Sequence, residues 1–305
     1  MTDIPALQSP GRAALAFTVL AAVGLGWGAA ALLSKIATET GYASLGLTLV
    51  QSAVGAVFFT AAVLARGLRL PLGRRYVIFY LVCGLVGTAL PHTLGYASIR
   101  HLPVGVQSIV LSAVPMMTFL LSLPLGLERF AWRRLGGLAL GAVAVLMIAL
   151  PEASLPEPGQ ALWLILPVVV AASYASENVY IATAKPRELE PLQVMCGLSF
   201  GALVLLIPPV WATGAWVVPA SLSPVDAALL GASVLHVFAY FGLVWLIGHA
   251  GPVFAAQVGY VVTASGVAWG MLVLGERHSA WVWGALVVMF AGLALVKPRE
   301  RARDD

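Results

Sequence analysis

Two short charged stretches decide how this chain is expected to fold: residues 126–129 read Gly-Leu-Glu-Arg, and residues 274–277 read Leu-Gly-Glu-Arg. Their glutamates, Glu128 and Glu276, are 148 residues apart. A glycine pair and a histidine pair recur at the same offset: Gly136 with Gly284, and His101 with His249. A charged Glu-Arg at equal spacing from a following glycine predicts an internal repeat, with residues 1–150 as one copy and residues 151–305 as the second.

The composition indicates a membrane protein. Of the 305 residues, 60% are hydrophobic and only 10% are charged, and the mean hydropathy is +0.94. A soluble domain carries about 25% charged residues, so most of this surface is expected to face lipid. The sequence pI near 9.3 would suit nucleic acid, but Lys and Arg form short clusters between apolar runs and no continuous basic face. Binding to nucleic acid is therefore excluded.

The apolar runs predict ten membrane-spanning helices, because a span needs about 20 residues. The first run, from about Ala13 to Ile36, is too long for the core of a signal peptide, so no cleavable leader is expected. The ten runs cover residues 13–36, 43–65, 76–98, 103–126, 133–150, 160–183, 191–212, 225–248, 252–275 and 279–297.

The distribution of basic residues predicts the orientation. With a cytoplasmic N-terminus, one side collects 14 of the 17 Lys and Arg residues, and only Lys35, Arg100 and Arg277 lie on the other. Both termini are thus expected in the cytoplasm. An odd number of helices per copy places the second copy upside down. The predicted fold is an all-α integral membrane protein of ten transmembrane helices in two inverted five-helix repeats, the construction typical of secondary transporters.

The repeated motif resembles a known family. A Leu-Gly-Glu-like motif after the fourth and ninth helices, followed by a glycine-rich helix, is similar to the EamA-type drug/metabolite transporter superfamily. The resemblance covers nearly the whole chain, and its length and short loops resemble amino-acid and metabolite exporters, including the aromatic amino acid exporter group. It implies a multi-pass protein of the bacterial inner membrane. The first copy departs from the pattern, with Leu127 where the second has Gly275.

The third and eighth predicted helices carry matching polar and aromatic residues. Thr88, His92 and Tyr96 are spaced i, i+4, i+8 and share one helix face. Adding 148 to the first two gives His236 and Tyr240, again at i, i+4. We expect these faces to form two walls of a central substrate-binding cavity. Structural hydrogen bonds to neighbouring helices would also explain each residue.

The fourth and ninth helices give a second matched set. Ser112 maps to Tyr260 at the same offset, and Pro115 maps to Thr263. Ser112, Tyr260 and Thr263 are predicted to line the cavity, although hydroxyl groups in helices also bond back to their own backbone. Pro115 removes a backbone donor and so frees a carbonyl inside the membrane.

The sixth helix carries a carboxylate at membrane depth. Tyr174, Glu177 and Asn178 share a face at i, i+3, i+4, and charged groups at such depth are costly and mark substrate or ion pathways. Glu177 is interpreted as a proton-coupling group or as a counter-charge for a substrate amine. Snorkelling, or pairing with Lys185, is the structural alternative. Tyr174, Glu177 and Asn178 complete the predicted substrate-binding residues.

These patterns predict a secondary transporter that exports small metabolites, amino acids above all, whether aromatic or otherwise neutral, by alternating access. Multidrug or other metabolite export is the alternative within the same superfamily. A membrane-embedded lipid-modifying enzyme is the alternative of another class, but the acids are scattered and the histidines isolated, so no catalytic residue, metal site or cofactor is predicted. A channel would need a ring of like charge or a filter loop. No P-loop is present, so no ATPase partner is expected.

Overall fold

The computed structural model describes residues 10–39, 41–128, 130–150, 155, 159–219, 223–250, 252–255 and 257–296, and this part of the chain contains helices and no strand. The helices are α1 (Pro10–Ala37), α2 (Ser44–Ala65), α3 (Arg74–Gly84), α4 (Leu90–Ile99), α5 (Val104–Leu111), α6 (Val114–Ser122), α7 (Trp132–Ala149), α8 (Ile165–Ala184), α9 (Pro191–Thr213), α10 (Pro224–Ala250), α11 (Pro252–Ala255), α12 (Val258–Leu274) and α13 (Ala280–Val296). A π-helical turn, Leu85–Ala89, joins α3 to α4, and a short 3₁₀ turn, Gln160–Leu164, precedes α8.

Eight of the helical segments in the described residues are long and apolar enough to cross a membrane. One of them, Arg74–Ile99, consists of α3, the π-helical turn and α4, and another, Val104–Ser122, of α5 and α6. Val258–Leu274 and Ala280–Leu295 are apolar but shorter. Helices suit lipid because they satisfy every backbone hydrogen bond within one segment.

Two of these segments are interrupted at prolines. Pro115 lies in the first turn of α6, where a missing N–H is tolerated because the first N–H groups of a helix have no partner within it. Helix α5 ends before it, at Leu111. The π-helical turn lies directly before Pro91, which lies in the first turn of α4. A proline ring clashes with the carbonyl four residues earlier, here that of Gly87, and the wider π turn relieves this clash.

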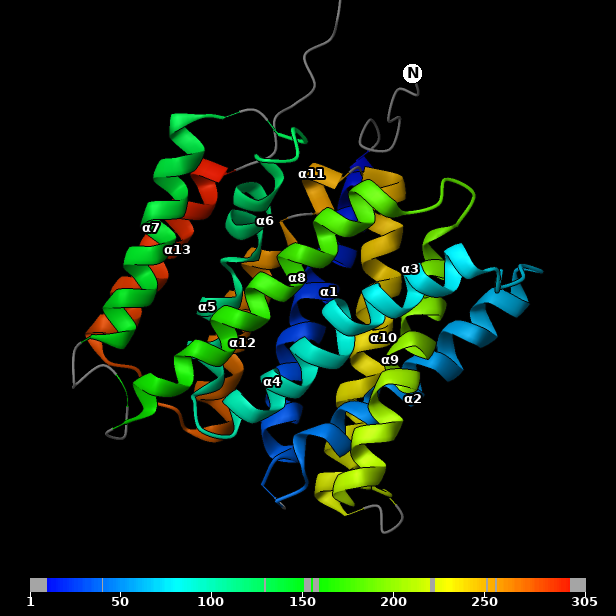
Figure 1. Ribbon diagram of the computed structural model, residues 1–305. Helices are drawn as coiled ribbons and strands as arrows, with labels where there is room; N and C mark the ends of the chain where they lie inside the picture. The colour runs from blue at the N-terminus through cyan, green and yellow to red at the C-terminus, as the bar shows by residue number, and fades with distance from the viewer. Residues whose placement is uncertain are drawn as a thin grey trace, which may run out of the picture.

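The helices form one bundle with distinct edges (Figure 1). Helices α7 and α13 pack together along one edge, and α2 packs against α9 at the other. Between them, α1 contacts both α10 and α12, while α8 runs along α4, α5 and α6. Helix α1 begins and α13 ends at the same end of the molecule (Figure 1).

Glycines permit the closest helix contacts. A Cβ atom at Gly201 of α9 would overlap the backbone oxygen of Tyr80 in α3, and one at Gly84 would overlap the backbone of α9. On α1, Gly28 lies against Ser265 of α12 in the same manner. Because these neighbours are backbone or short side chains, only glycine allows the helices to approach so closely.

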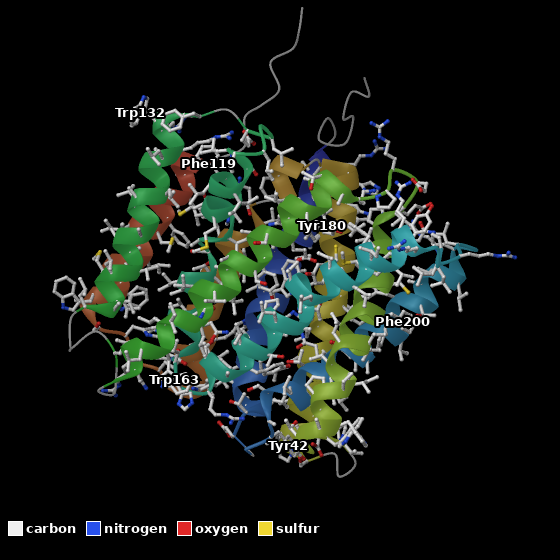
Figure 2. The ribbon with its side chains drawn as sticks, viewed as in Figure 1. Tyr42, Phe119, Trp132, Trp163, Tyr180 and Phe200 are labelled. Atoms are coloured by element: carbon white, nitrogen blue, oxygen red, sulfur yellow. The ribbon has the colours of Figure 1, made fainter. Side chains whose placement is uncertain are left out.

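Aromatic and basic side chains gather at the two ends of the bundle. Trp132 lies at the end where α1 begins, and Trp163 and Tyr42 lie at the opposite end (Figure 2). Near Tyr42, the ammonium of Lys35 donates to the carbonyls of Ile99, Arg100 and Leu102 at 2.6, 3.2 and 3.1 Å. Lys35 therefore satisfies carbonyls at the C-terminal end of α4 and in the loop that follows it.

A candidate substrate chamber between the helices

A small, partly open chamber lies among α2, the π-helical turn, α4, α9 and α10. Its walls therefore come from both halves of the chain. The wall residues are Gln51, Ser52, Gly55, Phe59, Thr88, His92, Met195, Leu198, Ser199, His236, Val237 and Tyr240. Most are apolar or hydroxyl-bearing, and none is charged, apart from any protonation of the two histidines.

Four aromatic rings meet at one side of this chamber. The Nε1–H of Trp27 on α1 donates to Nδ1 of His236 at 3.2 Å. The His236 ring lies edge-on to that of His92, with centroids 5.1 Å apart and an interplanar angle of 87°. Tyr240 lies 4.8 Å from His236 and 5.2 Å from Trp27, measured between centroids. Helices α1, α4 and α10 thus place Trp27, His92, His236 and Tyr240 in one cluster.

The two histidines differ in their hydrogen bonds. Because Nδ1 of His236 accepts from Trp27, the ring, when neutral, carries its proton on Nε2. Nδ1 of His92 is buried and has no hydrogen-bond partner in the described residues. A buried polar atom without a partner costs free energy, so this nitrogen is available to a polar group of a bound solute.

Tyr96 and Tyr174 stand behind the chamber wall. The hydroxyl of Tyr96 donates to Oε1 of Gln51 at 2.9 Å, and Gln51 itself lines the chamber. The ring of Tyr174 lies 6.3 Å from that of His92, between centroids. Both tyrosines contact lining residues and so support the wall.

Glu177 lies on α8 next to the π-helical turn. Its residue is 7% exposed, and its carboxylate packs against Gly87, the residue before the chamber-lining Thr88. Ser173, one turn earlier on α8, donates its hydroxyl to the carbonyl of Val86 at 2.7 Å. These contacts hold α8 against the turn.

The other predicted site residues lie outside the chamber lining. Ser112 donates to the carbonyl of Ile109 at 2.6 Å, and Thr263 to that of Gly259 at 3.0 Å, each within one helical turn. Tyr260 packs against Phe290 of α13, 5.5 Å between centroids. The amide of Asn178 is exposed and donates to Thr118 Oγ1 at 3.3 Å. The structure does not bring these four side chains to the cluster around His236.

Several lining residues were not among the sequence-derived candidates. Gln51 and Phe59 of α2 line the chamber, and Trp27 of α1 contacts the lining residues His236 and Tyr240. At the repeat offset Gln51 pairs with Ser199, which also lines the chamber, so this polar pair was a signal in the sequence. For Trp27 the signal was its depth in the middle of an apolar run, since tryptophan is more usual at membrane interfaces. Which face of α1 turned inward could not be read from the sequence.

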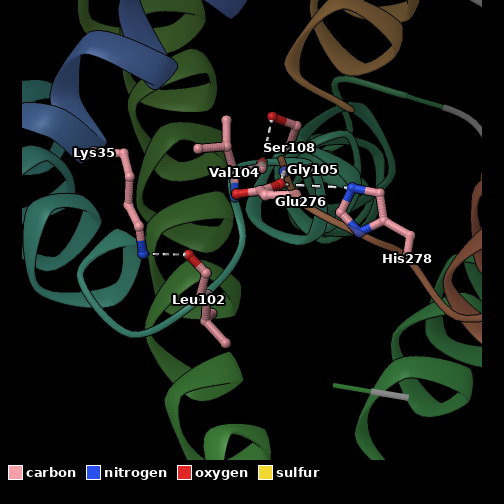
Figure 3. Close-up of polar contacts among 7 residues, drawn as sticks. All are labelled: Lys35, Leu102, Val104, Gly105, Ser108, Glu276 and His278. Carbon is pink, nitrogen blue, oxygen red and sulfur yellow. Dashed lines mark hydrogen bonds and ion pairs between the residues drawn. The ribbon is translucent and has the colours of Figure 1, made fainter. Parts of the chain in front are cut away.

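The second copy of the repeated motif has a structural role (Figure 3). Gly275 ends α12 with φ +68°, a conformation suited to glycine, and Glu276 follows it. Figure 3 shows Glu276 beside Val104 and Gly105. The Glu276 carboxylate accepts hydrogen bonds from the N–H groups of Val104, at 2.6 Å, and Gly105, at 3.2 Å. It therefore caps the N-terminus of α5, whose first N–H groups have no partner within the helix.

The first copy of the motif has a related backbone geometry. Gly126 has φ +65° after α6, and the Oε2 atom of Glu128 lies 2.5 Å from Nη1 of Arg134. Gly126 and Gly275 are 149 residues apart, whereas the two glutamates are 148 apart. Leu127 is therefore one additional residue between the turn and the glutamate, which accounts for the departure noted in the sequence.

The described residues contain no group of three or more His, Cys, Asp or Glu side chains placed to hold a metal ion. Cys83 and Cys196 are both buried and unbonded to each other. The polar and aromatic groups that line the chamber and could contact a solute are therefore phenyl and phenol rings, an amide, hydroxyls and imidazoles.

Comparisons with known proteins find a matching family, a named relative and a solved structure of similar fold. Residues 14–150 match the EamA-like transporter family. A protein of Streptantibioticus cattleyicolor, named a probable terminal-alkyne amino-acid exporter, is 27% identical over 170 residues, which cover 55% of each chain. The chain thus matches about half the length of this relative. A solved crystal structure without a functional name superposes with a TM-score of 0.60 at 17% identity, over 92% of this chain and 96% of the other, and shows likeness of fold alone.

Proposed function

We propose that this EamA-type transporter, a member of the drug/metabolite transporter superfamily, exports amino acids, aromatic or otherwise neutral, across the bacterial inner membrane. The observation that carries the proposal is the chamber, which lies between helices of both halves and is lined by His92, His236 and Tyr240. Substrate sites of inverted-repeat transporters lie at such an interface. The family match and the exporter-named relative point to a transporter and not to an enzyme.

The packing of the helices supports ten spans in two inverted repeats, with α1 and α8 as equivalent helices. The contact of α1 with α10 then corresponds to that of α8 with α4, and the contact of α1 with α12 to that of α8 with α5 and α6. The pairs α2 with α9 and α7 with α13 join equivalent helices to each other. Such a pattern is expected of two copies related by a pseudo-two-fold axis.

Alternating access follows from this arrangement. One half, or a bundle drawn from both, would move relative to the rest and open the chamber first to one side and then to the other. Solute export would then be passive or driven by an ion gradient. The lining includes no lysine or arginine, so phosphorylated solutes would meet no counter-charge there, whereas zwitterions and neutral or cationic drugs would fit.

Flux in proteoliposomes tests the proposal. The purified chain should catalyse saturable uptake and counterflow of Trp, Phe, Thr or Met. His92→Ala, His236→Ala and Tyr240→Ala should each lower this flux by about tenfold or more, because each removes a polar or aromatic wall group. His249→Ala is the matched control, since His249 is exposed at the end of α10.

Amino-acid counterflow that stays at the level of empty liposomes would reject the proposal. Saturable flux of lipophilic drugs without amino-acid flux would favour multidrug export instead, and turnover of lipid would favour a membrane enzyme. Unchanged transport in all three chamber variants would discard the chamber as the substrate site.

A further inference from the structure

Glu177 differs from the other buried acid of the described residues in having no partner. Asp226 is fully buried and accepts a hydrogen bond from the hydroxyl of Tyr42, with 3.3 Å between the oxygens. The carboxylate of Glu177, in a residue that is 7% exposed, has neither a hydrogen bond nor an ion pair with any group in the described part of the chain. An unpartnered buried carboxylate is costly, so the group is expected to serve a ligand.

The backbone around Gly87 makes room for this carboxylate. A Cβ atom at Gly87 would overlap Oε1 of Glu177 and also approach Oε2, so any other residue would displace the carboxylate. Gly87 lies at the centre of the π-helical turn, and π turns inside helices occur frequently at functional sites. The π-helical turn, Gly87 and Glu177 therefore form one closely packed unit next to the chamber wall.

Aromatic rings lie along the same stretch of the chamber wall. Tyr174 lies one turn before Glu177 on α8, and its ring is 6.3 Å from that of the chamber-lining His92, between centroids. Tyr240 of α10 joins the same group of rings, because it lies 4.8 Å from His236, whose ring is 5.1 Å from that of His92. A carboxylate and tyrosine rings around one chamber form a setting that attracts an organic cation, through charge and through the negative faces of the rings.

We propose that Glu177 forms the subsite for the ammonium group of the transported solute, with Gly87 providing the space and Tyr174 and Tyr240 the flanking rings. This inference rests on the proposed function, because it assigns a contact to the solute in the chamber. The lysines and arginines of the described residues lie at the ends of the spans and not beside Glu177. The positive charge that pairs with this carboxylate is therefore brought by the solute.

A series of three phenyl compounds tests this assignment with the purified full chain in detergent. Binding of phenylalanine, phenethylamine and 3-phenylpropionate is measured by titration calorimetry. Phenethylamine retains the ammonium group and lacks the carboxylate, whereas 3-phenylpropionate is the reverse. The wild type should bind both amines and bind 3-phenylpropionate at least about tenfold more weakly, the range expected for a charge-assisted contact.

Glu177→Gln should weaken binding of both amines by at least about tenfold while changing 3-phenylpropionate little or strengthening it. Glu177→Asp should restore part of the affinity for amines, since it keeps the charge. Glu39→Gln is the control, because Glu39 is exposed beyond the end of α1. A purely structural role of Glu177 would alter all three ligands by the same factor and would overturn the inference.

A second variant leaves the acid in place. Gly87→Ala should displace the carboxylate and weaken binding of the amines selectively, whereas Gly26→Ala, which meets no atom within 4 Å, should not. Wild-type protein that binds neither amine, or that binds 3-phenylpropionate as well as phenethylamine, also overturns the assignment. Phenethylamine binding without any amino-acid flux would retain the amine subsite and reject amino-acid export, so the two failures are distinguishable.

Discussion

At the level of single residues, Glu276 and His278 connect the end of α12 to the start of α5. Glu276 caps two N–H groups of α5, and Nε2 of His278 lies 3.5 Å from Oε2 of Glu276. The side chain of His278 is only 2% exposed. Both side chains are therefore well shielded from water, and changes in either should be measurable in the stability of the whole chain.

Glu276→Ala should lower the stability of the purified protein by about 2 kcal/mol, because it leaves two N–H groups of α5 without a buried acceptor. The shift is measured as a lower melting temperature in detergent. Glu39→Ala removes an exposed glutamate and serves as the control. An equal melting temperature for Glu276→Ala and the control would show that the cap contributes nothing.

Stability should also fall in mild acid because of His278. Burial lowers the pKa of this imidazole, and the nearby Glu276 carboxylate offsets the effect only in part. The folded state thus favours the neutral ring, so this contribution to stability is complete above the ordinary pKa of about 6.5 and is lost as the pH falls toward the lowered pKa. The melting temperature of the wild type should decrease from about pH 7.5 to about pH 5.5.

His278→Phe should lose part of this pH dependence, since it retains a buried ring without a titratable nitrogen. Melting curves of the variant and the wild type across the same pH range provide the comparison. Identical curves would exclude His278 as the source of the acid sensitivity.

The sequence identified part of the chamber at this scale and missed part. The offset of 148 residues pointed to His92, His236 and Tyr240, all of which line the chamber. It pointed equally to Tyr260, whose ring packs against Phe290, away from this cluster. Spacing along one helix shows which residues share a face, but the rotation of that face depends on neighbouring helices, which the spacing does not describe.

At the level of elements, the contact between α3 and α9 depends on glycine. Gly201 allows the backbone of Tyr80 to lie directly against α9. Apolar runs in the sequence located most of the spans, because length and hydropathy suffice for that purpose. They did not reveal the π-helical turn at Leu85–Ala89, since it arises from the combination of Pro91 with packing against α8.

Gly201→Ala should destabilise the protein by about 1–3 kcal/mol, because the added methyl group meets backbone that cannot move aside without separating the helices. Gly248→Ala on α10 is the matched control, since no atom lies within 4 Å of the added Cβ. By helix propensity alone, the control should be neutral or slightly stabilising. If the melting temperature in detergent rises for both variants, the close α3–α9 contact does not require glycine at position 201.

At the level of the whole molecule, the orientation remains a prediction from the distribution of Lys and Arg. Helix α1 begins and α13 ends at one end of the bundle, in agreement with termini on one side (Figure 1). The distribution places Arg187 in the cytoplasm and Thr213 outside. This assignment depends on all ten spans, because one fewer span before Thr213 would move it to the cytoplasm.

Single cysteines at these two positions test the topology in a background in which Cys83 and Cys196 are serine. A membrane-impermeant maleimide applied to intact cells should label Thr213→Cys and leave Arg187→Cys unlabelled until the membrane is permeabilised. Both positions are exposed in the structure, so access to the reagent depends on the side of the membrane. Reversed labelling would invert the orientation.

The cap on α5 has a consequence for the order in which the protein is made. The N–H groups of Val104 and Gly105 leave the ribosome long before Glu276, which is 172 residues after Val104 in the chain. Until that glutamate is synthesised and reaches α5, the nascent first half holds an incomplete helix end in the bilayer. The N-terminus of α5 in the first half therefore stays uncapped until the second half has been made. In a chain interrupted between the halves, this helix end would be capped only by a second polypeptide that supplies the missing carboxylate.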